Sequence, residues 1–215
     1  MPSLEGASFV KICGITSPHD ALDAVSCGAD GIGLILAASR RQLSVAQASE
    51  IAQATKGLVV RVAVFRHNTP EFILDAVDAT AADVAQVHGA LDDDLVAALR
   101  SRGVGVIKAL TAGDDEFFDF DETAVDAVLI DGPAPGSGEA HEWPDLAARA
   151  FRRPVIAAGG LDPGNVARVI ESTGVWGVDV SSGVERAPGV KDPSLVRDFV
   201  ANARARFNER EERRG

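Results

Sequence analysis

The sequence predicts an α/β protein that forms a single-domain, eight-stranded (β/α)8 TIM barrel. Eight short apolar runs rich in branched residues alternate along the chain with longer amphipathic stretches rich in Ala. This alternation implies parallel strands joined by right-handed helical crossovers. The length of 215 residues suits one barrel, and no linker rich in Pro, Gly or Ser divides the chain. We therefore assign residues 1–215 to one domain.

An internal similarity supports a closed barrel. The segments from Ile15 to Gly31 and from Leu161 to Gly177 each contain a Pro, a helix-like stretch and a final Gly-x-x-Gly turn. A doubly wound open sheet is the alternative. Such sheets commonly have fewer strands, and the Gly-rich fingerprint expected after their first strand is missing here.

Each element is predicted from its local pattern. The expected strands are Phe9–Cys13, Gly31–Leu36, Val59–Phe65, Val84–Val87, Gly105–Leu110, Ala127–Ile130, Val155–Ala158 and Gly177–Val180. The expected helices are Ser17–Cys27, Val45–Thr55, Pro70–Asp78, Asp92–Arg100, Trp143–Ala150, Pro163–Ser172 and Pro193–Phe207. Between Ala109 and Ala127 no good helix is predicted, although Phe117, Phe118 and Phe120 could hold an irregular element.

Helix boundaries carry recognisable signals. A capping residue followed by Pro predicts four helix starts, at Ser17-Pro18, Thr69-Pro70, Asp162-Pro163 and Asp192-Pro193. Glycine predicts helix ends at Gly28, Gly103 and Gly174. We expect residues 1–8 to be disordered, and we expect the charged run at about 208–215 to be a frayed helix end or a solvated tail.

Composition excludes several classes of partner. The net charge is −11, which argues against nucleic acid and anionic membranes, because both require a basic surface. The chain shows neither a signal peptide nor an apolar run long enough to span a membrane, and it has only two cysteines. We therefore expect a cytoplasmic protein. An acidic barrel of this size can be a monomer, and we expect a monomer.

Two Gly- and Ser-containing segments predict a phosphate site. In a closed α/β barrel, functional groups collect at the C-terminal ends of the strands, and phosphate often binds after the seventh and eighth. Gly159 and Gly160 follow the seventh expected strand, and Ser181, Ser182 and Gly183 follow the eighth. Bare backbone N–H groups in such loops bind anions without any net positive charge on the protein. Taken alone, the Gly159-Gly160 pair is weak evidence, because glycines there could simply make a tight turn.

Two titratable side chains are expected to face this phosphate site. Cys13 ends the first strand and Asp131 follows the apolar run of the sixth. A carboxyl group in dry surroundings has a raised pKa and can donate a proton near pH 7, so a thiolate and a carboxylic acid suit general base and general acid. From position alone, Cys13 could equally be a packed apolar residue, and Asp131 could be a turn residue.

Other residues are less informative. Cys27 precedes Gly28 and is interpreted as a packing residue, and His88 is interpreted as a hydrogen-bonded wall residue. No spacing of His, Cys and carboxylates fits a metal site, and no Ser-His-Asp arrangement is readable. Lys108 is expected at the mouth of the barrel, after the fifth strand.

The motifs together resemble phosphoribosylanthranilate isomerase, a family of tryptophan biosynthesis. The resemblance runs from about Val10 to Phe207 and keeps the family's order of motifs. The matching segments are Lys11-Ile12-Cys13-Gly14-Ile15-Thr16, Gln86-Val87-His88-Gly89, Asp131 followed by Gly136-Ser137-Gly138 and Trp143, Gly159 to Val166, Asp179 to Glu185, and Pro188 to Asp192.

The resemblance implies an aldose-ketose isomerase, an intramolecular oxidoreductase that needs no cofactor and no metal. Its substrate would be N-(5-phosphoribosyl)anthranilate, a phosphorylated sugar carrying anthranilate, and its product 1-(2-carboxyphenylamino)-1-deoxyribulose 5-phosphate. Asp131 would be the general acid and Cys13 the general base. Arg41 would bind the anthranilate carboxylate, although Arg40 is adjacent. Substrate binding by Lys11, Gln86 and His88 is also implied.

Two alternatives remain open at this stage. A related or dual-substrate phosphosugar isomerase, such as the histidine-pathway enzyme, resembles this chain but has an aspartate where Cys13 stands. A non-catalytic phosphosugar-binding barrel would keep the phosphate loops and lose the acid or base. Two stretches also depart from the family pattern, Leu36 to Ser39, which is smaller than expected, and Ala140-His141-Glu142, where an aromatic-Asp pair is common.

Overall fold

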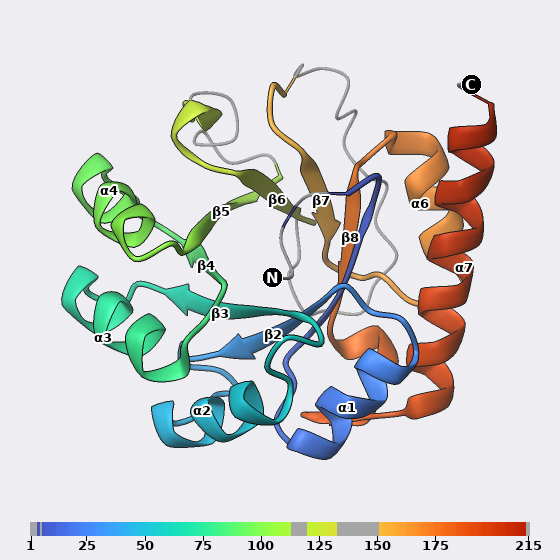
Figure 1. Ribbon diagram of the computed structural model, residues 1–215. Helices are drawn as coiled ribbons and strands as arrows, with labels where there is room; N and C mark the ends of the chain where they lie inside the picture. The colour runs from blue at the N-terminus through green and yellow to red at the C-terminus, as the bar shows by residue number, and fades with distance from the viewer. Residues whose placement is uncertain (1–3, 5, 113–119, 133–150, 214–215) are drawn as a thin grey trace.

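The computed structural model describes residues 4, 6–112, 120–132 and 151–213. Eight parallel strands form one closed barrel in chain order, with the helices around its outside (Figure 1). The predicted fold class is confirmed. The barrel strands are β1 Phe9–Cys13, β2 Gly31–Ile35, β3 Val60–Arg66, β4 Val84–His88, β5 Gly105–Thr111, β6 Ala127–Asp131, β7 Val155–Ala158 and β8 Gly177–Val180. All eight lie within one residue of the predicted bounds.

The helices and minor elements cover the barrel. The α-helices are α1 Pro18–Ser26, α2 Val45–Ala54, α3 Pro70–Thr80, α4 Asp93–Ser101, α6 Val166–Thr173 and α7 Pro193–Glu212. Short 3-10 turns span η1 Glu122–Ala124 and η3 Ser182–Val184, and a small hairpin joins β9 Glu185–Ala187 to β10 Val190–Lys191. The predicted helix Trp143–Ala150 lies outside the described residues, as do Phe117, Phe118, the Gly136–Gly138 motif and the Ala140–Glu142 departure.

Three of the four predicted helix starts are confirmed by their caps. The Ser17 and Thr69 side chains accept from the backbone N–H of Asp20 and Phe72, and Asp192 caps α7. The start at Pro163 is wrong, because the Asp162 carboxylate accepts from Gly164 and Asn165 N–H at 2.7 and 2.9 Å. That local turn satisfies the backbone first, so α6 begins only at Val166.

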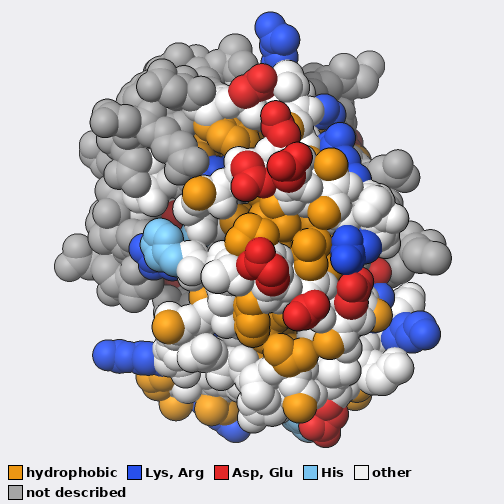
Figure 2. Space-filling model, turned by 90° about the vertical axis from the view of Figure 1, so that its left-hand side faces the viewer, with side chains coloured by type: hydrophobic (Ala, Val, Ile, Leu, Met, Phe, Trp, Pro, Cys, Tyr) orange, Lys and Arg blue, Asp and Glu red, His pale blue; other side chains and the backbone are white. Residues whose placement is uncertain are grey.

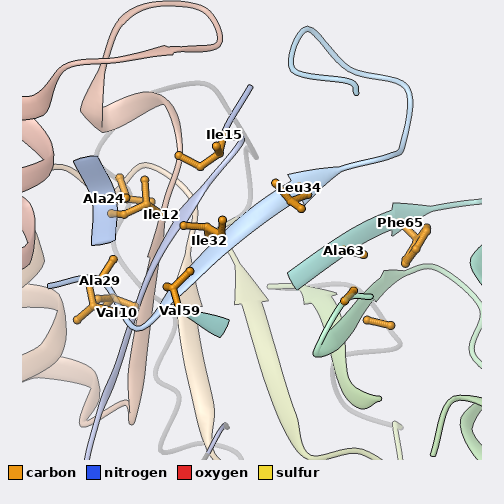
Figure 3. Packing of buried hydrophobic residues seen from close by; sticks show 14 of the residues in the cluster. Val10, Ile12, Ile15, Ala24, Ala29, Ile32, Leu34, Val59, Ala63 and Phe65 are labelled. Atoms are coloured by element: carbon orange, nitrogen blue, oxygen red, sulfur yellow. The ribbon is translucent and has the colours of Figure 1, made fainter. Parts of the chain in front are cut away.

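Side chains alternate between two cores, inside the barrel and between barrel and helices. Outside it, Ile12 of β1 packs beside Ala24 of α1 (Figure 3). The inner core contains Phe9, Cys13, Val60, Val62, Val64, Val84, Ile107, Ala109, Ala127, Leu129, Ile156 and Ala158. This alternation decides which residues can reach a site at the barrel mouth.

The expected place of Lys108 is wrong for that reason. Lys108 lies within β5 rather than after it, between the inward-facing Ile107 and Ala109. Its side chain therefore points outside the barrel, where Nζ donates to the Gly89 carbonyl at 2.6 Å and lies 5.6 Å from the centre of the Phe120 ring. Lys108 thus stabilises the connection between β4 and α4 and does not face the mouth of the barrel.

The described parts of both chain ends are more ordered than expected. Leu4 packs against the inner core, and the Trp176 indole N–H donates to the Gly6 carbonyl at 2.9 Å. Trp176 also stacks on Phe9, with ring centres 5.3 Å apart. At the other end, α7 continues to Glu212 and runs along α6 and α1 (Figure 1). Of the two alternatives expected for about 208–215, a helix end or a solvated tail, the structure agrees with the helix up to that residue.

Packing and ion pairs explain the length of α7. Phe207 is 2% exposed and belongs to the outer core. Arg204 pairs with Asp30, and Arg206 pairs with Glu171, so the charges of this segment meet acids on neighbouring elements. Beyond the predicted end at Phe207, Arg210 donates to the Val175 carbonyl at 2.7 Å, so the first part of the charged run also belongs to the packed helix.

Acidic side chains gather on the face of the molecule that carries α3 and α4 (Figure 2). Exposed acids there include Glu71, Asp75 and Asp78 on α3 and Asp93 and Asp94 on α4. This distribution agrees with the net charge of −11. Within the described chain, none of the helices is long and apolar enough to cross a membrane.

Replacing Phe207 by Ala should lower the free energy of unfolding by about 3–5 kcal/mol, because it opens a cavity under α7. Urea denaturation followed by circular dichroism measures this change. Glu211→Ala, at an exposed position of the same helix, is the matched control and should change stability by less than about 0.5 kcal/mol. A Phe207→Ala protein as stable as this control would mean that Phe207 does not pack in the outer core.

Candidate active site

A cavity opens at the C-terminal ends of the barrel strands. All the site residues predicted from the sequence line it, except Lys11, which is buried beneath it, and Gly183, which lies just outside its lining. The lining residues are Cys13, Ile35, Ala37, Ala38, Ser39, Arg41, Val64, Arg66, Gln86, His88, Leu129, Asp131, Ala158, Gly159, Gly160, Leu161, Asp179, Ser181 and Ser182. The structure thus brings together side chains from loops far apart in the chain.

Cys13 and Asp131 each lie against a glycine that leaves them room. A Cβ on Gly33, the β2 partner of Cys13, would lie 2.6 Å from the Cys13 Sγ. A Cβ on Gly159 would lie 2.5 Å from Asp131 Oδ1, and this glycine also has a φ of +89°. Larger residues at these positions would displace the two groups, so both glycines serve the geometry of the site.

Beneath these groups lies a buried polar chain. Lys11 is fully buried, with Nζ 2.8 Å from Asp179 Oδ1, and it donates to Gln86 Oε1 at 2.9 Å. The Gln86 amide nitrogen lies 2.9 Å from His88 Nε2. Burial, together with the charge on Lys11, lowers the pKa of His88 to about 4. His88 is therefore neutral at pH 7, and its Nε2 accepts from the amide.

The environment makes Asp131 a proton donor near neutral pH. Burial, with help from the nearby charge of Asp179, raises its pKa to about 6, and Lys11 and Arg66 oppose that rise. Burial also raises the pKa of the Cys13 thiol, although Lys11 acts in the opposite direction. The free protein thus holds Cys13 as a thiol, beside an ammonium group that favours the thiolate.

The loops after β7 and β8 touch through their backbones. A Cβ on Gly183 would lie 1.9 Å from the Leu161 carbonyl oxygen, so only glycine fits there. Gly160, with a φ of +67°, is held by a hydrogen bond from the Asn165 side chain to its carbonyl at 2.8 Å. The Ser181 hydroxyl is buried and has no hydrogen-bond partner within the described part of the chain. These two loops together present small residues and an available hydroxyl to the cavity.

Arg41 lines the cavity, and its guanidinium is paired with a carboxylate of the protein. Its guanidinium makes two hydrogen bonds to the Glu185 carboxylate, at 2.6 and 2.7 Å. Lys191 Nζ donates to the same carboxylate at 2.9 Å and to the Ser181 carbonyl at 3.0 Å. Burial opposes a charge on Glu185, but Arg41 and Lys191 outweigh it and lower its pKa. Arg41 is therefore fixed beside the β8 loop.

Four residues of this site were missed by sequence reasoning as functional candidates. They are Asp179, Glu185, Lys191 and Arg66. Asp179 and Arg66 could have been found from strand alternation, since Asp179 stands two residues before Ser181, and Arg66 continues the inward series Val60, Val62 and Val64. Nothing local in the sequence indicates that Glu185 meets Arg41. Across the described residues, no group of His, Cys, Asp and Glu is arranged to hold a metal ion.

Comparison with known proteins identifies the family. A family model for N-(5'-phosphoribosyl)anthranilate isomerase matches residues 10–202. The chain belongs to this family. A Halobacterium salinarum member is 39% identical over 91% of this chain and 95% of its own length. The chain is thus an isomerase, as the sequence predicted.

Solved structures of family members agree with this assignment. The isomerase from Thermus thermophilus is 39% identical, with a TM-score of 0.79 and coverage of 92% of this chain and 98% of its own. The Thermotoga maritima enzyme is 34% identical, with a TM-score of 0.83 and coverage of 92% and 99%. Another family member, 33% identical with a TM-score of 0.80 and coverage of 92% and 99%, was solved with reduced 1-(o-carboxyphenylamino)-1-deoxyribulose 5-phosphate.

Replacing Gly183 by Ala should lower the free energy of unfolding by about 1–3 kcal/mol, because the new methyl group collides with the Leu161 backbone. Chemical denaturation measures this change. Ser182→Ala, which removes an oxygen from the neighbouring residue and adds no bulk, is the control and should stay close to wild type. Equal stability of both variants would show that the two loops are not in contact.

Proposed function

We propose that the protein catalyses the Amadori rearrangement of N-(5-phosphoribosyl)anthranilate to 1-(2-carboxyphenylamino)-1-deoxyribulose 5-phosphate in tryptophan biosynthesis. The observation that carries the proposal is the meeting of Asp131 and Cys13 in one cavity bordered by two small-residue loops. The family member bound to the reduced form of that product supports the substrate class. We further propose that residues 1–215 act as one domain.

Asp131 would start the reaction as the general acid. Its proton passes to the ring oxygen of the furanose, the bond from C1 to that oxygen breaks, and the anthranilate nitrogen forms a double bond to C1. The raised pKa of Asp131, about 6, supports this role, because the group can hold a proton near neutral pH and release it to the substrate. The carboxylate left behind then faces the positively charged iminium.

Cys13 would act next as the general base. Its thiolate takes the proton from C2, and the electrons of that bond form a C1–C2 double bond while the nitrogen becomes neutral. A proton gained at C1 and one lost from the C2 hydroxyl complete the ketone, so no net proton is consumed. Because Cys13 rests as a thiol, it must first be deprotonated, and the charge on Lys11 supports the thiolate.

The phosphate would bind in the loops after β7 and β8. Gly159, Gly160, Ser182 and Gly183 offer backbone N–H groups, and the unpartnered hydroxyl of Ser181 is a further donor. Backbone donors suit this protein because its overall charge of −11 repels anions at longer range. The substrate's phosphate is thereby held on the β7–β8 side of the mouth.

The remaining predicted residues keep their roles as proposals. Gln86 and His88 would form a polar wall for the sugar, and Lys11 would support that wall from below. Arg41 would bind the anthranilate carboxylate only after releasing Glu185. No cofactor or metal enters any of these steps. We propose a monomer, although a Thermotoga maritima relative is described as dimeric.

Incubating the protein with phosphoribosylanthranilate should remove the anthranilate-type fluorescence. Cys13→Ala and Asp131→Asn should each lower kcat by at least about a hundredfold, because each removes a proton-transfer group. Cys27→Ala, which changes the other cysteine of the chain, is the matched control and should retain wild-type kcat. Unchanged kcat in either active-site variant would remove that residue from the mechanism, and absent turnover by folded wild-type protein would refute the proposed function.

Arg41→Ala should raise KM by about tenfold or more with a smaller effect on kcat, as expected when a ground-state contact is lost. Steady-state kinetics with the same fluorescence signal measure both constants. Arg40→Ala is the control, because Arg40 is exposed and does not line the cavity. If Arg40→Ala raises KM and Arg41→Ala does not, Arg40 is the residue that binds the carboxylate.

A further inference from the structure

We infer that Lys191 is a positioning residue for phosphate binding, and that its buried ammonium group supplies a positive charge behind the loop after β8. The inference rests on the proposed function, and it adds a residue to which the sequence motifs assign no role. Lys191 is the last residue of β10, and it is buried outside the lining of the cavity. It would therefore act on the substrate through the loop that its side chain contacts.

The hairpin of β9 and β10 holds Lys191 behind that loop. Lys191 pairs with Glu185 in the register of the hairpin, and its backbone N–H donates to the Asp20 carboxylate of α1 at 3.1 Å. The Thr16 hydroxyl, between β1 and α1, donates to the Gly189 carbonyl of the hairpin turn. These contacts tie the hairpin to the connection after β1, so the backbone fixes where the ammonium group lies.

One hydrogen bond of this ammonium group orients a peptide of the proposed phosphate loop. Lys191 Nζ donates to the Ser181 carbonyl at 3.0 Å. The peptide that joins Ser181 to Ser182 is trans, so its N–H points away from the lysine. Both serines line the cavity. The same hydrogen bond polarises the peptide, which makes its N–H a better donor to an anion.

The charges around Lys191 leave one positive charge in excess. Arg41 and Lys191 share the single carboxylate of Glu185, through hydrogen bonds of 2.6, 2.7 and 2.9 Å. A phosphate monoester carries about 1.5 to 2 negative charges at pH 7. The loops after β7 and β8 bring only uncharged residues to the lining, which are Gly159, Gly160, Leu161, Ser181 and Ser182. The charge that complements the phosphate therefore comes from behind these loops.

The pKa values of the two buried lysines of the site agree with this difference in pairing. Burial lowers the pKa of Lys191, although Glu185 acts in the opposite direction. Burial also opposes the charge of Lys11, but Asp179 and Cys13 outweigh it and raise the pKa of that lysine. A phosphate bound at the β8 loop would add negative charge near Lys191 and favour its charged form.

The test compares two ligands that differ only in the phosphate. The first ligand is reduced 1-(2-carboxyphenylamino)-1-deoxyribulose 5-phosphate, and the second is the same compound without its phosphate group. Titration calorimetry gives the ratio of the two affinities. Lys191→Met should lower this ratio at least about tenfold, because only the first ligand meets the lost charge. A general disturbance of the site, or of Arg41, would weaken both ligands alike and leave the ratio unchanged.

Two further variants complete the test. Lys191→Gln, whose amide can still donate to a carbonyl, is a second uncharged variant and should also lower the ratio. Arg61→Met is the matched control, because Arg61 is also a buried cation, paired with Asp83 at 2.8 Å near the start of β3 and so at the other end of the barrel. Its ratio should equal that of wild type.

The possible outcomes separate the inference from the proposed function. If either folded Lys191 variant keeps the wild-type ratio, or if Arg61→Met lowers it equally, Lys191 has no specific role toward the phosphate and the inference is wrong. That result would leave the proposed function intact, because wild type would still prefer the phosphorylated ligand. If folded wild-type protein binds neither ligand, or does not prefer the phosphorylated one, both the proposed function and the inference are overturned.

Discussion

The buried ion pair between Lys11 and Asp179 is the interaction on which the rest of the site depends. The two residues are register partners on β1 and β8, where the barrel closes, and their charged atoms lie 2.8 Å apart. Leaving either charge buried without the other would cost several kcal/mol, so the pair constrains this seam. Gln86 links the ion pair to His88. Its side-chain oxygen accepts from Lys11 Nζ, and its amide nitrogen lies next to His88 Nε2. The polar floor of the active site is thereby fixed.

This floor influences the protonation of both Cys13 and Asp131. Cys13 is buried and Asp131 is half-buried. This loss of solvent raises the pKa of each, and Asp179 adds to both effects while Lys11 opposes them. For Asp131 the raised pKa means that the carboxyl group can donate a proton near neutral pH. For the thiol the result is a proton that would have to leave before the proposed catalysis, and the charge of Lys11 would stabilise the thiolate. One ion pair therefore influences both ends of the proposed proton transfer.

Much of this arrangement is readable from sequence, and the reasons for the failures are physical. Strand bounds and the positions of Cys13 and Asp131 follow from apolar runs and from the barrel's rule for strand ends. Lys108 was misplaced because it lies inside its strand, between the inward-facing Ile107 and Ala109, and the alternation of side chains turns it outward. The pairing of Arg41 with Glu185 joins residues 144 positions apart, and only the closed barrel brings them together. α7 continues past its predicted end at Phe207, where Arg210 donates to the Val175 carbonyl, a partner that no local pattern shows.

The most direct test of this account is the titration of the Asp131 carboxyl group in the free protein, followed by carbon-13 NMR. The resonance can be assigned by its disappearance in Asp131→Asn. We expect a titration midpoint near 6, well above the ordinary value for aspartate, so that the group gains its proton as the pH falls through that point. A midpoint near 4 would mean that Asp131 is ionised throughout the neutral range, and it would contradict the proposed role of this residue as the general acid.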